Sequence, residues 1–222
     1  MYGISGEYDK LFHDRDFKYL YSKCLLIKHL NDQDATGNKM VDKKNVELAF
    51  VEKVEPSHLH SFQFPSKVGG KPSWLSLSPL PSNKDLECAK CGKILSFLLQ
   101  VYCPVETSVN AFHRTLFVFI CRNVSCYSKN SNVNFYVLRS QLPRNNDFYS
   151  SDPPKKGVLE GPSADSYHDL CMVCGLQGPK KCSRCHSAVY CSKEHQQIHW
   201  KNGHKAVCKP DYSQDEGAVT VP

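Results

Sequence analysis

Eight cysteine and histidine side chains with metal-ligand spacing lie between Cys171 and Cys208. They follow the pattern C-x2-C-x7-C-x2-C-x5-C-x3-H-x8-H-x3-C. Zinc takes four tetrahedral sulfur or nitrogen ligands, and structural sites draw them from C-x2-C knuckles and from a second pair further along the chain. Eight ligands in four pairs therefore predict two zinc ions. A segment this short cannot bury an extended apolar core, so metal coordination must supply much of its folding free energy.

The four pairs can be grouped around two ions in two ways. A sequential grouping would place both knuckles on one ion, with seven intervening residues that include Gly178 and Pro179. This arrangement is cramped. An interleaved grouping gives each ion one knuckle and one later pair, so that the two sites brace each other. The interleaved sets are Cys171, Cys174, Cys191 and His195 for the first zinc, and Cys182, Cys185, His204 and Cys208 for the second.

A DNA-reading zinc finger is the rival interpretation of the same segment. Ser192 can cap a short helix that starts near Lys193, and this helix would carry His195 and His199 on one face. The nine residues between Cys185 and His195 fall short of the roughly twelve in that motif. The rival grouping would also leave three ligand candidates without a metal. We therefore expect His199 to be a surface or packing residue.

Other histidines and cysteines lack partners at ligand spacing. We expect His168 and His186 to be plain surface residues. Free buried cysteine often acts as a small hydrophobe, which is the interpretation we favour for Cys24 and Cys103. His113 could be a ligand, a hydrogen-bonded core residue or an exposed one, and the two latter interpretations are favoured.

A third set of candidate zinc ligands lies upstream. The knuckle Cys88/Cys91 is separated by 29 residues from Cys121, which ends an apolar run and is followed by Cys126. These four thiols predict a third zinc site in a zinc-ribbon-like domain.

Runs of apolar and aromatic residues predict where the strands lie. Residues 46–51 alternate as a half-buried strand does, and residues 94–102, 115–121 and 135–138 are strand-length apolar runs. A turn is predicted at residues 68–72, where glycine supplies positive φ angles. Residues 45–150 are therefore predicted to form a β-rich domain.

The remaining segments have the composition of connections and ends. Residues 1–44 are expected to be a poorly ordered extension. The only regular element that its pattern indicates is one short amphipathic helix, with apolar positions at Phe12, Phe17, Tyr19, Leu20 and Leu25. Residues 151–167 are rich in proline and glycine and are expected to be a linker to a zinc finger at 168–208. Residues 209–222 are expected to be a disordered tail. The predicted fold class is α+β: small zinc-stabilised domains, one β-rich and one a two-zinc finger with a short C-terminal helix.

Composition narrows the class of protein. Twelve cysteines, mostly in knuckle pairs and without a signal-peptide pattern, indicate reduced thiols inside the cell. No apolar run approaches the roughly 18 residues of a membrane span, so no membrane association is expected. The formal charge of +6 counts thiols as neutral. Two sites of net charge −1 and one of −2 would lower it to about +2, because zinc ligands bind as thiolates.

A resemblance to a known type of zinc finger becomes specific at this point. Its segments are Cys171-Met172-Val173-Cys174, Cys182-Ser183-Arg184-Cys185, Tyr190-Cys191-Ser192-Lys193-Glu194-His195, Trp200, and His204-Lys205-Ala206-Val207-Cys208. They resemble a MYND-type finger. The resemblance implies interleaved pairing and a surface that docks short proline-containing peptides. His195 departs from that pattern, in which cysteine is more frequent, although imidazole is an equally competent ligand.

Upstream segments extend the resemblance to a whole family. The matching stretches are residues 64–75, 96–102, 111–114 and 141–149. Together with the finger they resemble the programmed cell death protein 2 family, over about Val46 to Cys208. Members of that family begin near the equivalent of Val46 and continue into a C-terminal domain with another C-x2-C knuckle. Residues 1–39 are therefore expected to be an upstream extension or a gene-model artefact, and the chain is expected to lack that domain.

The resemblance implies a nuclear and cytoplasmic adaptor linked to cell proliferation and apoptosis. Its implied protein partner is a small-subunit ribosomal protein handled during ribosome assembly, and a DNA-binding transcriptional regulator is the alternative. Catalysis is not expected, since every predicted zinc already has four protein ligands. Six lysine and arginine residues against one glutamate between Cys171 and Cys208 keep a nucleic-acid partner open, but with weak affinity.

Overall fold

The computed structural model describes residues 25–29, 49–153, 158 and 160–210. Its strands are β1 (Leu25–His29), β2 (Ala49–Lys53), β3 (Lys67–Val68), β4 (Ser96–Tyr102), β5 (His113–Ile120), β6 (Phe135–Leu142), β7 (Lys180–Lys181) and β8 (Val189–Tyr190). Its short 3-10 helices are η1 (Pro56–Leu59), η2 (Ser61–Gln63), η3 (Val124–Cys126) and η4 (Ala164–Ser166). Three helical segments follow β8: α3 (Lys193–His199), the π-helical η5 (Trp200–His204) and α4 (Lys205–Val207).

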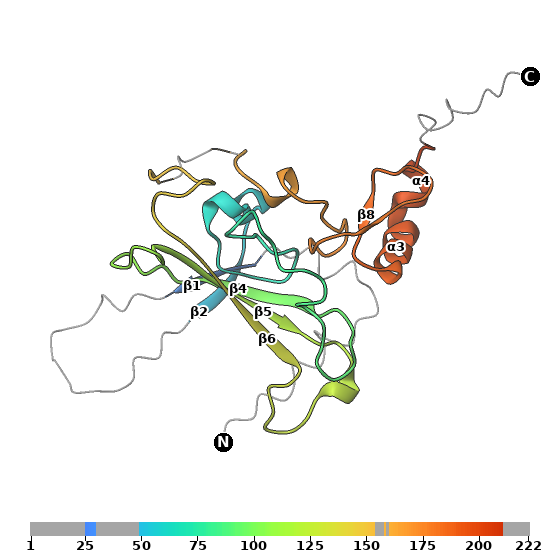
Figure 1. Ribbon diagram of the computed structural model, residues 1–222, viewed down its shortest axis with the longest axis horizontal. Helices are drawn as coiled ribbons and strands as arrows, with labels where there is room; N and C mark the ends of the chain where they lie inside the picture. The colour runs from blue at the N-terminus through green and yellow to red at the C-terminus, as the bar shows by residue number, and fades with distance from the viewer. Residues whose placement is uncertain (1–24, 30–48, 154–157, 159, 211–222) are drawn as a thin grey trace, which may run out of the picture.

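Six strands form one antiparallel sheet in the order β2-β1-β3-β4-β5-β6, and β7 pairs with β8 in a separate ribbon (Figure 1). The predicted β-rich character is confirmed: β4, β5 and β6 overlap the runs at 94–102, 115–121 and 135–138. The predicted turn follows β3, where Gly69 and Gly70 have φ angles of 73° and 71°. Glycine adopts these angles without the steric cost that other residues have.

β1 corrects our expectation for the N-terminal segment. Leu25 was assigned to a helix in a poorly ordered extension, whereas Leu25–His29 is a strand between β2 and β3. A short apolar run suits a helix or a strand equally well by periodicity, and the partners that decide between them lie far along the chain. Phe12, Phe17, Tyr19, Leu20, Cys24 and the rest of residues 1–24 lie outside the described residues.

The core of the sheet unit lies on one face of β5. Phe117 and Phe119 are fully buried there, and the Trp74 ring packs against both, tilted to Phe117 at a centroid distance of 5.1 Å and stacked on Phe119 at 6.2 Å. Gln100 on β4 is also buried, and its amide bonds Ser73 N–H at 2.8 Å and the carbonyl of Pro65 at 2.9 Å. These bonds satisfy a polar group that would otherwise cost free energy to bury.

The finger, residues 168–208, packs directly on this core. Leu176 belongs to the same buried cluster as Trp74, and the Trp74 indole N–H donates to the Gly175 carbonyl at 3.0 Å. Gln177 donates to the carbonyl of Leu80 at 2.8 Å. Figure 1 shows the finger, with β8, α3 and α4, beside the unit that carries the large sheet.

The predicted linker at 151–167 is also corrected in its second half. Ala164 in η4 is buried within the core cluster, and the Cα of Gly161 lies so close to Phe62 that a Cβ there would be 2.5 Å from the ring. Gly161 therefore allows the chain to approach the core closely, because glycine has no Cβ. In the tail, only Lys209 and Pro210 are described.

The helix predicted after Ser192 is present as α3. The Ser192 hydroxyl accepts from the backbone N–H of His195 at 3.3 Å, which satisfies one of the free donors of the first turn. Asn202 and Gly203 leave the helical conformation, and this kink separates α3 from α4. None of the described helices is long and apolar enough to cross a membrane.

Candidate metal centres

The three C-x2-C knuckles fold into the same turn. In each, the residue after the second cysteine donates its backbone N–H to the carbonyl of the first: Gly92 to Cys88 at 2.8 Å, Gly175 to Cys171 at 2.9 Å, and His186 to Cys182 at 2.9 Å. These donors have φ angles of 65°, 71° and 52°. A turn of this kind aims both thiols at one point. His186 is exposed, as expected, yet it also closes a knuckle at a φ that glycine prefers.

The first cluster in the finger joins Cys171, Cys174, Cys191 and His195. Cys174 Sγ lies 3.5 Å from Cys191 Sγ, and His195 Nδ1 lies 3.5 Å from Cys171 Sγ. The knuckle brings the first two thiols, β8 ends next to Cys191, and α3 supplies the imidazole. The interleaved grouping is therefore the one that the structure forms.

The second cluster joins Cys182, Cys185, His204 and Cys208. Cys182 Sγ lies 3.8 Å from Cys208 Sγ, and His204 Nε2 lies 3.6 Å from Cys185 Sγ. His204 therefore presents Nε2, whereas His195 presents Nδ1 to the first cluster. The kink at Gly203 precedes His204 and Cys208, which both turn back toward the second knuckle.

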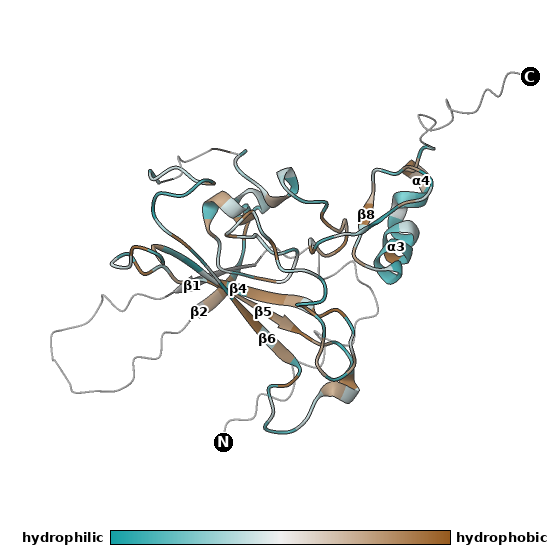
Figure 2. Ribbon diagram, viewed as in Figure 1, coloured by the Kyte–Doolittle hydropathy of each residue, from teal (hydrophilic) through white to brown (hydrophobic). Residues whose placement is uncertain are grey.

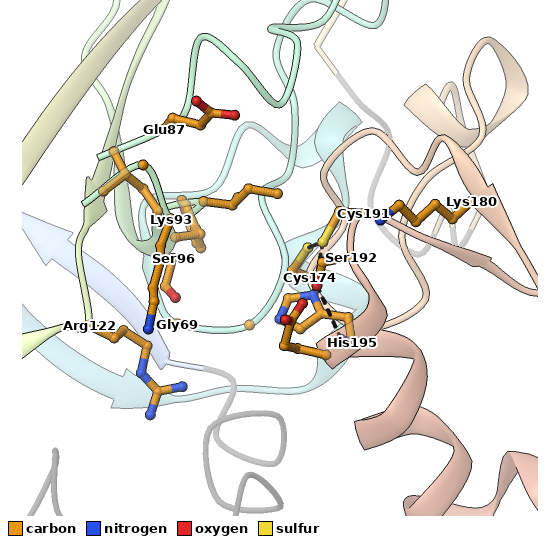
Figure 3. Close-up of a pocket in the computed structure, with 16 residues that line it drawn as sticks. Gly69, Glu87, Lys93, Ser96, Arg122, Cys174, Lys180, Cys191, Ser192 and His195 are labelled. Carbon is orange, nitrogen blue, oxygen red and sulfur yellow. Dashed lines mark hydrogen bonds between the residues drawn. The ribbon is translucent and has the colours of Figure 1, made fainter. Parts of the chain in front are cut away.

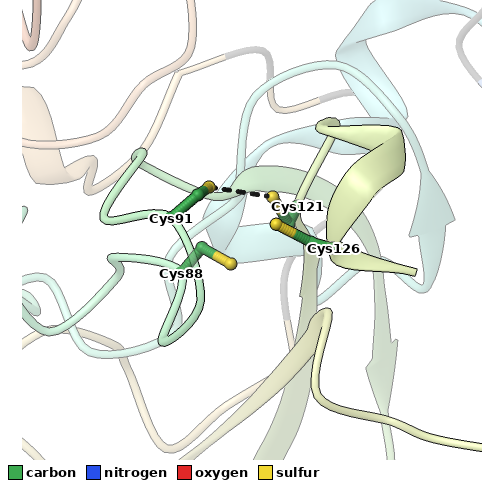
Figure 4. Close-up of side chains that lie close together, drawn as sticks. All are labelled: Cys88, Cys91, Cys121 and Cys126. Atoms are coloured by element: carbon green, nitrogen blue, oxygen red, sulfur yellow. Dashed lines mark hydrogen bonds between the residues drawn. The ribbon is translucent and has the colours of Figure 1, made fainter. Parts of the chain in front are cut away.

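The third cluster, in the sheet unit, joins Cys88, Cys91, Cys121 and Cys126 (Figure 4). Cys91 Sγ and Cys121 Sγ are 3.6 Å apart. Cys121 follows the end of β5, and the turn of η3 brings Cys126 back to the same point. The backbone N–H of Asn123 donates to Cys121 Sγ at 3.4 Å, an interaction that stabilises a thiolate.

The distances in all three clusters fit tetrahedral zinc. Within each cluster the four candidate ligand atoms lie within 4.8 Å of one another. Zn–S bonds of about 2.3 Å place two sulfurs of a regular tetrahedron about 3.8 Å apart, and a sulfur and a nitrogen about 3.5 Å apart. The distances given above are close to these values. The chemistry of the donors, thiolate and imidazole, is also that of structural zinc.

The thiols of the third cluster differ in acidity. The backbone N–H of Lys93 lowers the pKa of Cys91 to about 7, whereas burial raises the pKa of Cys121 to about 12. This hydrogen bond therefore favours the thiolate form of Cys91. A divalent cation must displace the proton of Cys121, which is a cost that its positive charge offsets.

Neither His199 nor His113 belongs to a cluster. His199 Nδ1 lies 2.9 Å from the Tyr190 hydroxyl, and its ring stacks on His204 at 4.8 Å. The DNA-finger grouping is therefore not formed. His113 is buried, with Nδ1 2.8 Å from the Tyr102 hydroxyl and its ring on Phe64.

Two other expectations for single residues are refined by the structure. Cys103 is half-buried and lies outside the clusters, held through its backbone by Arg114. His168, expected at the surface, is half-buried, and its Nε2 has no hydrogen-bond partner among the described residues.

A groove of about 510 Å³ separates the finger from the sheet unit (Figure 3). Cys174, Cys191 and His195 of the first cluster line one wall. The opposite wall is the segment that follows the upstream knuckle, and Lys93 and Arg122 point along it. Sequence reasoning missed this groove, because it exists only where the finger packs on the core.

Comparisons with known proteins agree with this architecture. The family model of the programmed cell death protein 2 N-terminal domain matches residues 45–156, and that of the MYND finger matches residues 171–208. Programmed cell death protein 2 of Bos taurus is 49% identical over 168 residues, which are 73% of this chain and 47% of the relative. The chain belongs to the programmed cell death protein 2 family. It spans about half the length of programmed cell death protein 2 from Bos taurus and from Mus musculus.

Two further similarities are shorter. Programmed cell death protein 2-like of Homo sapiens is 36% identical over 92 residues, covering 41% of this chain and 24% of the relative. Ubiquitin carboxyl-terminal hydrolase 19 of Arabidopsis thaliana is 51% identical over 49 residues, but these are 7% of the hydrolase. No solved structure matches the chain. Family membership, the MYND finger and three zinc-compatible clusters are thus established together.

Proposed function

We propose that this protein is a zinc-dependent adaptor that docks another protein, and that its zinc ions are structural. The observation that carries the proposal is the closed ligand set of each cluster, with four protein side chains converging on one point. Structural zinc sites are closed in this way, whereas catalytic sites keep one position open for water or substrate. The chain is accordingly proposed to be a binding protein and not an enzyme.

The proposed ligands follow the clusters. Cys171, Cys174, Cys191 and His195 hold the first zinc, and Cys182, Cys185, His204 and Cys208 the second. Cys88, Cys91, Cys121 and Cys126 hold the third, in a ribbon-like arrangement that ties the upstream knuckle to the end of β5. Bound zinc would fix α3 and the two knuckles relative to each other, which the short β7–β8 ribbon is too small to do alone.

The groove between the finger and the sheet unit is the proposed docking site. Its finger wall includes three ligands of the first zinc, so loss of that ion would remove the wall itself. Glu87 and Glu194 lie on opposite walls among the basic side chains Lys93 and Lys180. Such a mixed lining suits a peptide of either charge with apolar residues between the charges.

We propose a small-subunit ribosomal protein as the partner, in the nucleus and cytoplasm, with a role connected to cell proliferation and cell death. Support comes from the family resemblance and from the names of the relatives, which refer to programmed cell death. Sequence-specific DNA binding is not proposed, because His195 and His199 do not share a metal site.

Photo-crosslinking from the groove tests this function. A photoreactive amino acid at Lys93 or Lys180 should crosslink a small-subunit ribosomal protein in cells, and the adduct should survive nuclease treatment. The same amino acid at exposed Lys84, which does not line the groove, is the matched control. Cys191→Ser should abolish the crosslink from Lys180. Equal crosslinking from Lys84, or an adduct that nuclease removes, would contradict the proposal.

A further inference from the structure

Among the described strands, β6 is the last of the sheet and is paired along one side only. It pairs with β5 at eight consecutive positions from Phe135 to Leu142, without a bulge. In the described part of the chain no strand lies on its other side. An uninterrupted edge of this length is a template for another strand.

The register shows which backbone groups of β6 face outward. The N–H of Cys121 donates to the carbonyl of Asn134, so Tyr136, Leu138 and Ser140 continue the series that bonds to β5. In an antiparallel ladder the alternate residues direct N–H and C=O to the other side. These residues are Val137, Arg139 and Gln141, and no hydrogen bond to their outward groups exists among the described residues.

The outer edge of β6 has few of the features that normally prevent another strand from pairing with an exposed edge. Charged residues, proline and bulges blunt most exposed edges. In β6 the only charged side chain is Arg139, and the first proline is Pro143, just after the strand. Tyr136 and Val137 are 37% and 56% exposed, and the apolar half of β6 is coloured as hydrophobic in Figure 2.

A groove of about 430 Å³ runs beside the same strand, between β6 and the segment that precedes the upstream knuckle. Trp74, Pro79 and Leu80 line it opposite Tyr136 and Leu138, and its polar lining comes from Ser76, Asp85, Arg139 and Ser140. Tyr136 and Leu138 point to the core-side face, because they lie opposite the buried Phe119 and Phe117. A strand added to β6 would therefore place alternate side chains over the apolar part of this groove.

The charge of this region favours an acidic occupant on the other face. Residues 107–146 contain no aspartate or glutamate, and their cations are Arg114, Arg122, Lys129, Arg139 and Arg144. Arg139 is exposed and makes no hydrogen bond or ion pair with the described residues. The negative thiolates of the third cluster do not cancel the charge of Arg139. Cys121 of that cluster lies beside Asn134, about 17 Å along the strand from Arg139. This distance exceeds the screening length of about 8 Å at physiological salt.

We propose that the outer edge of β6 is a strand-addition site for an extended segment of a partner protein. Apolar side chains at alternate positions of this segment lie over the groove, and acidic side chains on the opposite face meet Arg139. The site lies on the sheet unit and shares no lining residue with the groove beside the finger. It therefore stands whether or not the proposed docking function of the finger is correct.

Amide hydrogen exchange of the zinc-loaded full chain tests the proposal with defined probes. The probes are two eight-residue peptides, one alternating valine with glutamate and one alternating valine with lysine. The glutamate probe should slow exchange at Val137, Arg139 and Gln141 at least tenfold, and should bind about tenfold more tightly than the lysine probe. Tyr136 and Leu138 should change little, because their amides already bond to β5.

Arg139→Glu provides the charge control and should reverse the preference between the probes, since the substitution lies on an exposed side chain. Val137→Pro should abolish binding by removing an outward donor, and unchanged exchange at Leu138 shows that the sheet remains intact. Three results would overturn the proposal: no slowing at the three outward amides, equal binding of both probes, or protection already present without probe. Protection lost on deletion of residues 1–24, or on dilution, would assign the edge to this chain or to a second copy.

Discussion

Trp74 donates its indole N–H to the carbonyl of Gly175 at 3.0 Å, and this hydrogen bond is one of those that join the sheet unit to the finger. Trp74 is a core residue of the sheet unit, and Gly175 closes the first knuckle of the finger. A ligand-bearing turn is thus fixed directly to the hydrophobic core. Metal binding in the finger and packing in the sheet unit should therefore depend on each other.

Replacing Trp74 with phenylalanine tests this connection. The substitution leaves the buried Gly175 carbonyl without its donor, which should cost about 1–3 kcal/mol. Amide exchange at Gly178 in the finger should accelerate as well. Tyr149→Phe is the control, because its hydroxyl donates to Leu75 within the sheet unit. It should lower stability without a selective effect on the finger; equal acceleration in both variants would contradict the connection.

Gly175→Ala should destabilise the protein more than Gly92→Ala. Both glycines close a knuckle at similar φ angles, +71° and +65°, so the backbone cost of about 1 kcal/mol is shared. A Cβ on Gly175 would lie 2.9 Å from Lys71 Cβ, whereas Gly92 has open space. Urea unfolding of both variants measures the difference. Equal midpoints would show that the finger is not held against Lys71.

The interleaved grouping predicts which substitutions release metal. Cys191→Ser should release the first zinc and unfold the finger, since zinc binding supplies roughly 10 kcal/mol or more in small fingers. His199→Ala should keep both zinc ions, because His199 contacts Tyr190 and His204 without entering a cluster. Metal analysis after gel filtration separates these outcomes. Loss of an ion from His199→Ala, with none from His204→Ala, would support the DNA-finger grouping instead.

Ser192→Ala should weaken the finger by about 1 kcal/mol, since it removes the cap of the helix that carries His195. Ser192→Asp should restore most of the loss, because aspartate is also a good N-cap. Thermal unfolding with zinc present measures both. If alanine and aspartate behave alike, the hydroxyl has no capping role.

Local signals were sufficient to predict much of the site. The four-residue knuckles, the Ser192 cap and the alternation of the central strands are short-range patterns, and they predicted the ligand groupings and strands β4 to β6. The interleaved grouping was preferred because the sequential one is cramped, and the DNA-finger grouping was rejected because it leaves three candidate ligands without a metal.

Features that depend on distant contacts were not predictable in the same way. β1 is a strand because β2 and β3 lie on either side of it, and an apolar run of this length does not reveal such partners. The second half of the supposed linker packs on the core through Ala164, although its composition is that of a flexible connection. Both grooves likewise form from segments that are far apart in the sequence.

Native mass spectrometry of the purified, reduced chain tests the central claim most directly. The claim is that three closed clusters of four ligands each hold one structural zinc, so the account predicts three zinc ions per chain. Cys88→Ser should lower the number by one while both finger ions remain. Fewer than two tightly bound zinc ions in the unmodified chain would contradict the account.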